Sequence, residues 1–213
     1  MAKLYLVQMT KNKLRFVVPF AALFVLIPAL AALILSGPES DIRTADCIRQ
    51  LHVWIPLFST WWILIYAGDF FLHDGNELMY LIWKPYQITV CVAAGIAAYM
   101  AAAVLSFAVL QSVQPFDLLL LWQILAETWM MAGLAFFCCF LFQSTGAALM
   151  AAVLYDIYLN LFDGLHMFSA ISIFPQQTLK VEADPPRMAA AWIAGIVLFA
   201  GGAVCVKGRK NYW

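Results

Sequence analysis

The chain has 213 residues, of which 65% are hydrophobic and 11% charged, and its formal net charge is zero. Soluble domains are roughly 45–50% apolar and about 25% charged, so this composition excludes an ordinary soluble domain and indicates an integral membrane protein. The charge balance points to neither nucleic acid nor an acidic partner. Four of the five cysteines lie in apolar runs and Cys47 in a polar loop, without the spacing of a disulfide framework or a zinc site.

Apolar stretches of the length needed to cross a bilayer, about 20 residues, dominate the sequence. Six candidates are residues 16–36, 51–67, 88–113, 118–142, 145–162 and 188–206. The polar stretches between them are too short to fold alone. We therefore predict an all-α membrane protein with a single transmembrane domain over residues 1–213. The first apolar run follows a basic flank, but it exceeds the roughly 7–15 residues of a signal-peptide core, so we predict a retained span.

Orientation is predicted from the Lys and Arg residues of the short loops, which favour the cytoplasm. With both termini inside, eight basic residues are cytoplasmic and four are outside. This prediction puts residues 69–85 in the cytoplasm and 164–187 outside. In the outer stretch, residues 165–174 are apolar but too few to span, so they either dip into the outer leaflet or lie on it. Residues 1–14 form either an interfacial helix or a disordered tail.

The sequence of the connector over residues 69–85 predicts a short helix with a defined start and end. Asp74 and Glu77 are spaced as a capping box, and Pro85 disfavours helix in the residue before it. We expect a helix over about residues 74–84. Its apolar side would consist of Leu78, Met79, Leu81 and Ile82. A capped helix of about three turns is more ordered than a plain connector needs to be.

Two carboxylates fall inside predicted spans, Glu127 in the fourth and Asp156 in the fifth. A charge there costs several kcal/mol, by rough insertion scales, unless it faces the protein interior or water. No Lys or Arg lies within any predicted span, so these groups are protonated, hydrogen-bonded or at the edge of water. Asp156 and Asn160 share a helix face. Three roles for this helix face stay open. It could make polar contacts between helices or line a wet cavity, it could contact a substrate, or it could bind a cation or zinc.

Aromatic and histidine residues carry weaker signals. Trp129 lies deep in its span and either lines a hydrophobic pathway or packs. The three histidines are expected to be solvated or hydrogen-bonded. Small residues between 93 and 103 would allow close helix approach in the third span. No catalytic motif and no GxxxxGK[ST] loop is present, so we expect no enzyme, no metal and no phosphate-binding loop on this chain.

This arrangement resembles the permease subunit of type-2 ATP-binding-cassette (ABC) transporters, which are mostly exporters. The resemblance comprises six spans, a structured cytoplasmic connector after the second, and a broken apolar segment outside before the sixth. Family members often carry an acidic residue, then Gly, then Glu-Leu in the connector. The corresponding residues here are Asp69, Gly75, Glu77 and Leu78, and only Lys84 adds basic character.

The resemblance implies that residues 69–85 contain a coupling helix, which docks on a separate ATPase subunit. Two ATPase copies would hold ATP and Mg, and a second permease chain, identical or related, would complete the complex in a bacterial cell membrane. Glu77 would then serve as a helix cap or as the partner of a basic ATPase residue. Two alternatives are a proton- or ion-coupled carrier that uses Glu127 and Asp156, and a membrane assembly or immunity factor that transports nothing.

Overall fold

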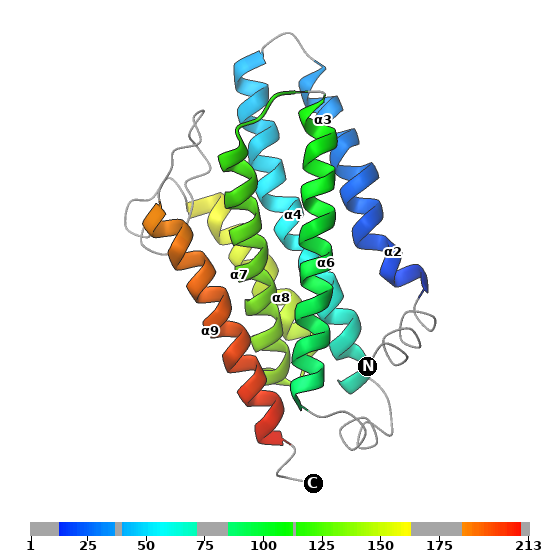
Figure 1. Cartoon of the computed structure of the whole chain (residues 1–213), viewed down its shortest axis with the longest axis vertical. Coiled ribbons are helices and arrows are strands. Elements are labelled where there is room, and N and C mark those ends of the chain that lie inside the picture. The colour runs from blue at the N-terminus through cyan, green and yellow to red at the C-terminus, as the bar shows by residue number, and fades with distance from the viewer. Residues whose placement is uncertain (1–12, 37–39, 72–84, 113, 163–184, 210–213) are drawn as a thin grey trace.

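The computed structural model describes residues 13–36, 40–71, 85–112, 114–162 and 185–209. All regular structure in these residues is helical, which confirms the predicted all-α class. The helices run in alternating directions, so the end of α4, the start of α6 and the end of α9 lie at one end of the bundle (Figure 1). The elements are α2 (Lys13–Ala21), η1 (Ala22–Leu26), α3 (Ile27–Leu35), α4 (Ser40–Phe71), α6 (Pro85–Gln111), α7 (Leu118–Phe142), α8 (Thr145–Phe162) and α9 (Pro185–Arg209).

Four of the described helices are long and apolar enough to cross a membrane. They cover Val17–Leu35, Tyr86–Gln111, Leu118–Phe142 and Pro185–Gly208. The chain is therefore a multi-pass membrane protein. The helices α4 and α8 occupy the places of the second and fifth predicted spans, but α8 has a shorter apolar part and α4 is more polar.

The helix α4 is much longer than the predicted second span. It has 32 residues, or about 48 Å at 1.5 Å per residue, and begins at Ser40 instead of residue 51. The polar loop assigned to Cys47 is therefore wrong: Cys47 is buried, as are Ile48 and Leu51 at helical spacing. Arg43, one turn into the helix, donates to the carbonyl of Ile34 at 3.0 Å and so covers the end of α3.

The first membrane helix contains one π-helical turn, η1, between α2 and α3. Pro28 has no N–H to give to the carbonyl of Phe24, which interrupts the α pattern here. The N–H of Ile27 reaches back to the carbonyl of Ala22 instead of Leu23. The Leu23 carbonyl accepts a hydrogen bond from the hydroxyl of Ser106 on α6. The π turn thus ties the first helix to α6.

The centre of the bundle is α7, with 78% of its apolar stretch buried, against 28% for α9. It starts at Asp117, whose carboxylate accepts the N–H of Leu119 at 3.0 Å. It ends at Gln143, which has a left-handed φ of 56°. Ser144 then accepts the N–H of Ala147 and starts α8. This tight turn places α8 antiparallel beside α7.

The helices α7 and α9 approach each other closely at their glycines. An added Cβ at Gly195 of α9 would lie 2.3 Å from the ring of Trp129, and one at Gly202 would lie 2.4 Å from the ring of Phe136. The two glycines, seven residues apart, thus receive two aromatic rings seven residues apart on α7. We expected close approach at the small residues of the third span, yet on α6 several of these alanines are exposed.

Several expectations lie outside the described residues. These are most of the interfacial helix or tail at 1–14, the coupling helix at about 74–84 with Asp74, Gly75, Glu77, Leu78, Met79, Leu81 and Ile82, and most of the outer segment 164–186. Asp69 lies in the last turn of α4, and its side chain is outside the described part. The single-domain assignment over 1–213 stays a prediction.

Candidate functional site

Glu127 lies in the tenth position of α7 and is only 4% exposed. The helix around it is apolar, and its neighbours along the buried face include Gln123 and Thr128, also buried. A carboxylate so placed needs a partner, because an isolated charge in this surrounding costs several kcal/mol, as a rough figure. The spans predicted from the sequence contain no Lys or Arg to provide one.

His52 of α4 provides that partner. Its Nδ1 lies 2.6 Å from Oε2 of Glu127, and the two side chains are each 5% exposed. The pair is a hydrogen bond when the imidazole is neutral, and a buried ion pair when it is protonated. This confirms the hydrogen-bonded alternative for Glu127 and for this histidine. The two residues lie 75 positions apart in the sequence.

Pro56 shapes the helix next to His52. It follows His52 by four residues and has no N–H to donate to the His52 carbonyl. Three polar contacts surround this turn of α4: Tyr99 of α6 donates to the Ile55 carbonyl at 2.7 Å, and Ser59 donates to the carbonyls of Pro56 at 2.6 Å and of Thr128 at 3.4 Å. These contacts hold this turn of α4 between α6 and α7, next to His52.

Asp156 of α8 adds a second carboxylate. It is 8% exposed, and it repels the carboxylate of Glu127 when both are ionised. The neighbouring Tyr155 is within electrostatic range of Glu127, and its hydroxyl lies 3.9 Å from Sδ of Met130 on α7. We call His52, Glu127 and Asp156 the polar cluster. It links three helices, α4, α7 and α8.

The polar cluster unites two of the four predicted pathway residues. The ring of Trp129 packs on α9, with its centroid 4.6 Å from that of Phe199 and 6.2 Å from that of Trp192. Its assignment to a pathway stays a prediction. Asn160 lies on α8, and its side chain is outside the described part. His52 was missed as a member, since the sequence gives no signal that pairs it with α7.

A metal site is not favoured by this geometry. Within the described segments, no three His, Cys, Asp or Glu side chains converge in a way that would hold a metal ion. The imidazole of His52 and the carboxylate of Glu127 instead bond to each other directly, at 2.6 Å. The His52–Glu127 contact joins α4 to α7.

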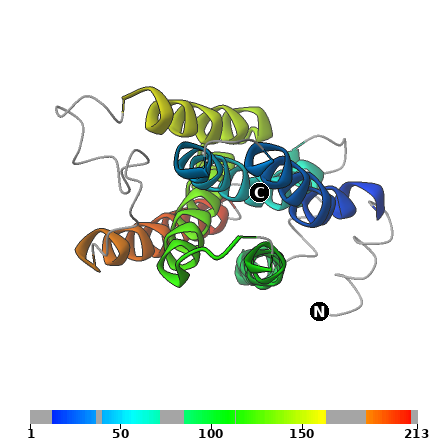
Figure 2. The same cartoon turned by 90° about the horizontal axis from the view of Figure 1, so that it is seen from above.

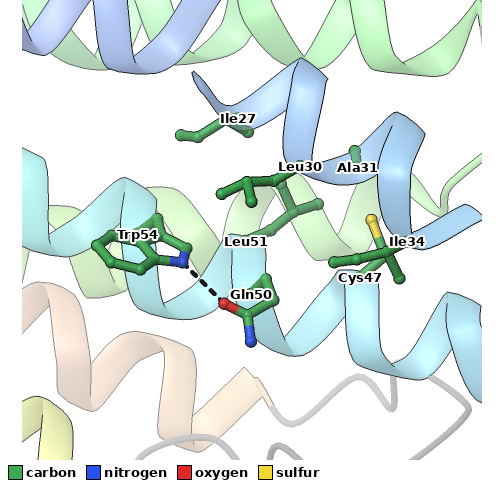
Figure 3. Close-up of a pocket in the computed structure, with 8 residues that line it drawn as sticks. All are labelled: Ile27, Leu30, Ala31, Ile34, Cys47, Gln50, Leu51 and Trp54. Carbon is green, nitrogen blue, oxygen red and sulfur yellow. Dashed lines mark hydrogen bonds between the residues drawn. The ribbon is translucent and has the colours of Figure 1, made fainter. Parts of the chain in front are cut away.

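A small pocket lies elsewhere, between α3 and α4 (Figure 3). Its volume is about 10 Å³, which is roughly the room of one water molecule. Its lining is apolar except for Gln50, whose Oε1 accepts from Nε1 of Trp54 at 2.7 Å. None of the polar-cluster residues lines it. This pocket is too small for an organic substrate.

The chain matches no protein-family model, no curated protein and no solved structure.

Proposed function

We propose that this chain is the permease subunit of a type-2 ABC transporter in a bacterial cell membrane, with six spans and both termini in the cytoplasm. The supporting observation is the direction of the helices. The last turn of α4, the first turn of α6 and the last turn of α9 lie at the same end of the bundle (Figure 1). The connector over residues 72–84 is attached at that end, where an ATPase subunit would have access to it.

The length of α4 supports the same proposal. At about 48 Å, this helix is longer than the roughly 30 Å hydrocarbon core of a bilayer. It ends at Phe71, directly before the connector, and it packs on α7 and α8 as well as on the first membrane helix. A displacement of the connector would therefore be transmitted along α4 to the polar cluster.

The energy would come from a separate chain. Two ATPase subunits would bind ATP and Mg, and each would move one permease by pushing on its coupling helix. The contact with the ATPase would be made by the apolar side of that helix, Leu78, Met79, Leu81 and Ile82. The aromatic, weakly charged helices favour an amphipathic or hydrophobic cargo such as a peptide, drug or lipid. A second permease, identical or related, would form the other half of the pathway.

Affinity isolation of the chain from its own membrane tests this function. The expected result is co-purification of a soluble-domain ATPase of about 25–35 kDa, an ordinary size for one or two domains. A matched isolation in high salt should retain the pair if the contact is mainly apolar, because salt screens exposed charges but does not weaken apolar burial.

Absence of any ATPase would contradict the proposal. Transport that then collapses with proton uncouplers would favour the carrier that uses Glu127 and Asp156. If neither an ATPase nor transport is found, the remaining hypothesis is that the chain is an assembly or immunity factor.

A further inference from the structure

We propose that the pocket between α3 and α4 is a binding site for one phospholipid, whose acyl chain lies along the pocket and whose phosphate binds the guanidinium of Arg43. Figure 2 looks down on this end of the bundle, where α3 and the start of α4 lie side by side. The inference goes beyond the proposed function and does not depend on it.

The pocket has a buried floor and half-buried walls. On the floor, Ala31, Cys47 and Leu51 are only 1–2% exposed. Leu30 and Ile34 on the α3 side are half-buried, so the pocket is open along one side. The lining side chains of the two helices face one another across it (Figure 3). An apolar slot therefore runs between the helices along their length.

The open side of the pocket belongs to the membrane surface of the protein. The helix α3 is part of the span Val17–Leu35, and only 28% of the apolar stretch of that span is buried. The one amide of the lining, Gln50, accepts the indole N–H of Trp54 at 2.7 Å. The surface that this pocket offers to the bilayer is thus mainly hydrocarbon, which matches an acyl chain.

The size of the pocket selects among apolar occupants. Its enclosed volume of about 10 Å³ is too small for an aromatic ring or for the large side chains of another helix. A linear alkyl chain needs no closed cavity of its own size, because it lies along the open side and is only partly enclosed. The pocket therefore fits a lipid tail better than a second protein helix.

A cation stands at the rim of the pocket. Arg43 precedes Cys47 by one helical turn, so it lies on the same face of α4, about 6 Å nearer the start of the helix. Its Nη1 donates to the carbonyl of Ile34, itself a lining residue, at 3.0 Å. Ile34 is one residue from the end of α3 and of the membrane span. The guanidinium is thus held where the apolar part of the helix ends.

The chemistry of Arg43 matches a phosphate at this depth. A guanidinium has five N–H donors in a planar fork that fits phosphate oxygens, and the bond to Ile34 uses one of them. Basic side chains beside apolar slots between membrane helices are the usual sites of lipid head groups. Arg43 and the pocket one turn deeper follow each other in the order of the phosphate and the acyl chain of a phospholipid.

Native mass spectrometry of the delipidated full chain in maltoside detergent, titrated with phosphatidylglycerol, tests the site. Wild type should bind one phospholipid more tightly than any further ones. Arg43→Gln should weaken this binding about tenfold or more, because a charge-assisted contact is lost. Arg49→Gln is the matched control, since it removes the same charge from an exposed position on another face of α4. It should keep the binding of wild type.

A second pair of variants tests the pocket apart from the cation and stays informative if Arg43→Gln fails to fold. Leu30→Trp adds a large ring to the wall of the pocket and should weaken binding by a similar factor. Leu33→Trp is its control, because Leu33 is 71% exposed and does not line the pocket. Binding to this control should equal that to wild type.

The source of the phosphate is tested with two further ligands. Dioleoylglycerol has the acyl chains without the phosphate, so wild type should bind it about as weakly as Arg43→Gln binds phosphatidylglycerol. Inorganic phosphate should not displace the lipid. The proposal is overturned if Arg43→Gln or Leu30→Trp binds phospholipid as tightly as wild type, if Arg49→Gln loses as much as Arg43→Gln, or if inorganic phosphate empties the site. A dimer of the chain that Leu30→Trp disperses would also overturn it, because the pocket would then hold a second copy.

Discussion

At the scale of single residues, the main feature is a buried pair of ionisable groups from two helices. His52 and Glu127 are in contact at 2.6 Å and nearly inaccessible to solvent. Such a pair contributes little net stability when intact, but it is costly to break from one side. Its value lies in specifying how α4 and α7 align, since a shift along either helix would separate the two atoms.

Replacement of His52 by Leu should lower the free energy of unfolding by about 2 kcal/mol, because Glu127 is left buried without its partner. The double variant His52→Leu with Glu127→Leu should recover most of this loss. Ser106→Ala is the control, since it removes one buried neutral hydrogen bond and should cost about 1 kcal/mol or less. Thermal unfolding in detergent would measure all three. Equal losses for His52→Leu and Ser106→Ala would contradict the account.

Sequence analysis found only part of this site. A carboxylate inside an apolar stretch can be recognised from the sequence alone, and the sequence predicts Glu127 and Asp156 in this way. The partner of Glu127 is not predicted, because a contact across 75 residues leaves no local pattern, and a histidine beside Gln50 and Arg49 resembles the end of a span. Trp129 was selected for its depth, yet depth does not tell which face of the helix a side chain occupies.

At the scale of elements, helix bounds were predicted well where hydropathy changes abruptly. The predicted spans 118–142 and 145–162 coincide with α7 and α8, which are separated by one sharp turn. The start of α4 was missed because its first turns are charged, with Asp41, Arg43, Asp46 and Arg49. The burial of Cys47, Ile48 and Leu51 shows the helical period that overrides this polarity.

The α7–α9 interface depends on the absence of side chains at two glycines. Gly195→Ala should destabilise the protein by about 1–3 kcal/mol, because the added methyl overlaps the Trp129 ring. Gly208→Ala on the same helix is the matched control, as its Cβ would meet nothing within 4 Å. Detergent unfolding curves that show the same shift for both variants would be inconsistent with this packing.

Movement of α8 can be followed through a cysteine at the polar cluster. In a background without the five native cysteines, Asp156→Cys should react with a membrane-impermeant thiol reagent in at least one nucleotide state. Leu154→Cys is the control on the same helix, because Leu154 is 57% exposed and faces away from the bundle. It should stay unreactive when surrounded by lipid. Protection of Asp156→Cys in every state would mean that the cluster is a fixed polar contact between helices.

At the scale of the whole molecule, the chain is a multi-pass helical protein whose central helix α7 contacts α4, α6, α8 and α9. Its composition alone established the membrane class. The proposed family rests instead on the resemblance and on the common end shared by the last turn of α4, the first turn of α6 and the last turn of α9 (Figure 1).

The most direct test is affinity isolation of the double variant Leu78→Asp and Met79→Asp beside wild type. Two charges on the apolar side of the predicted coupling helix should remove the ATPase from the isolate, because each would have to be buried unpaired at the contact. The amount of chain in the membrane and its unfolding temperature should stay the same. Recovery of an equal amount of ATPase activity with the double variant would contradict the proposed coupling.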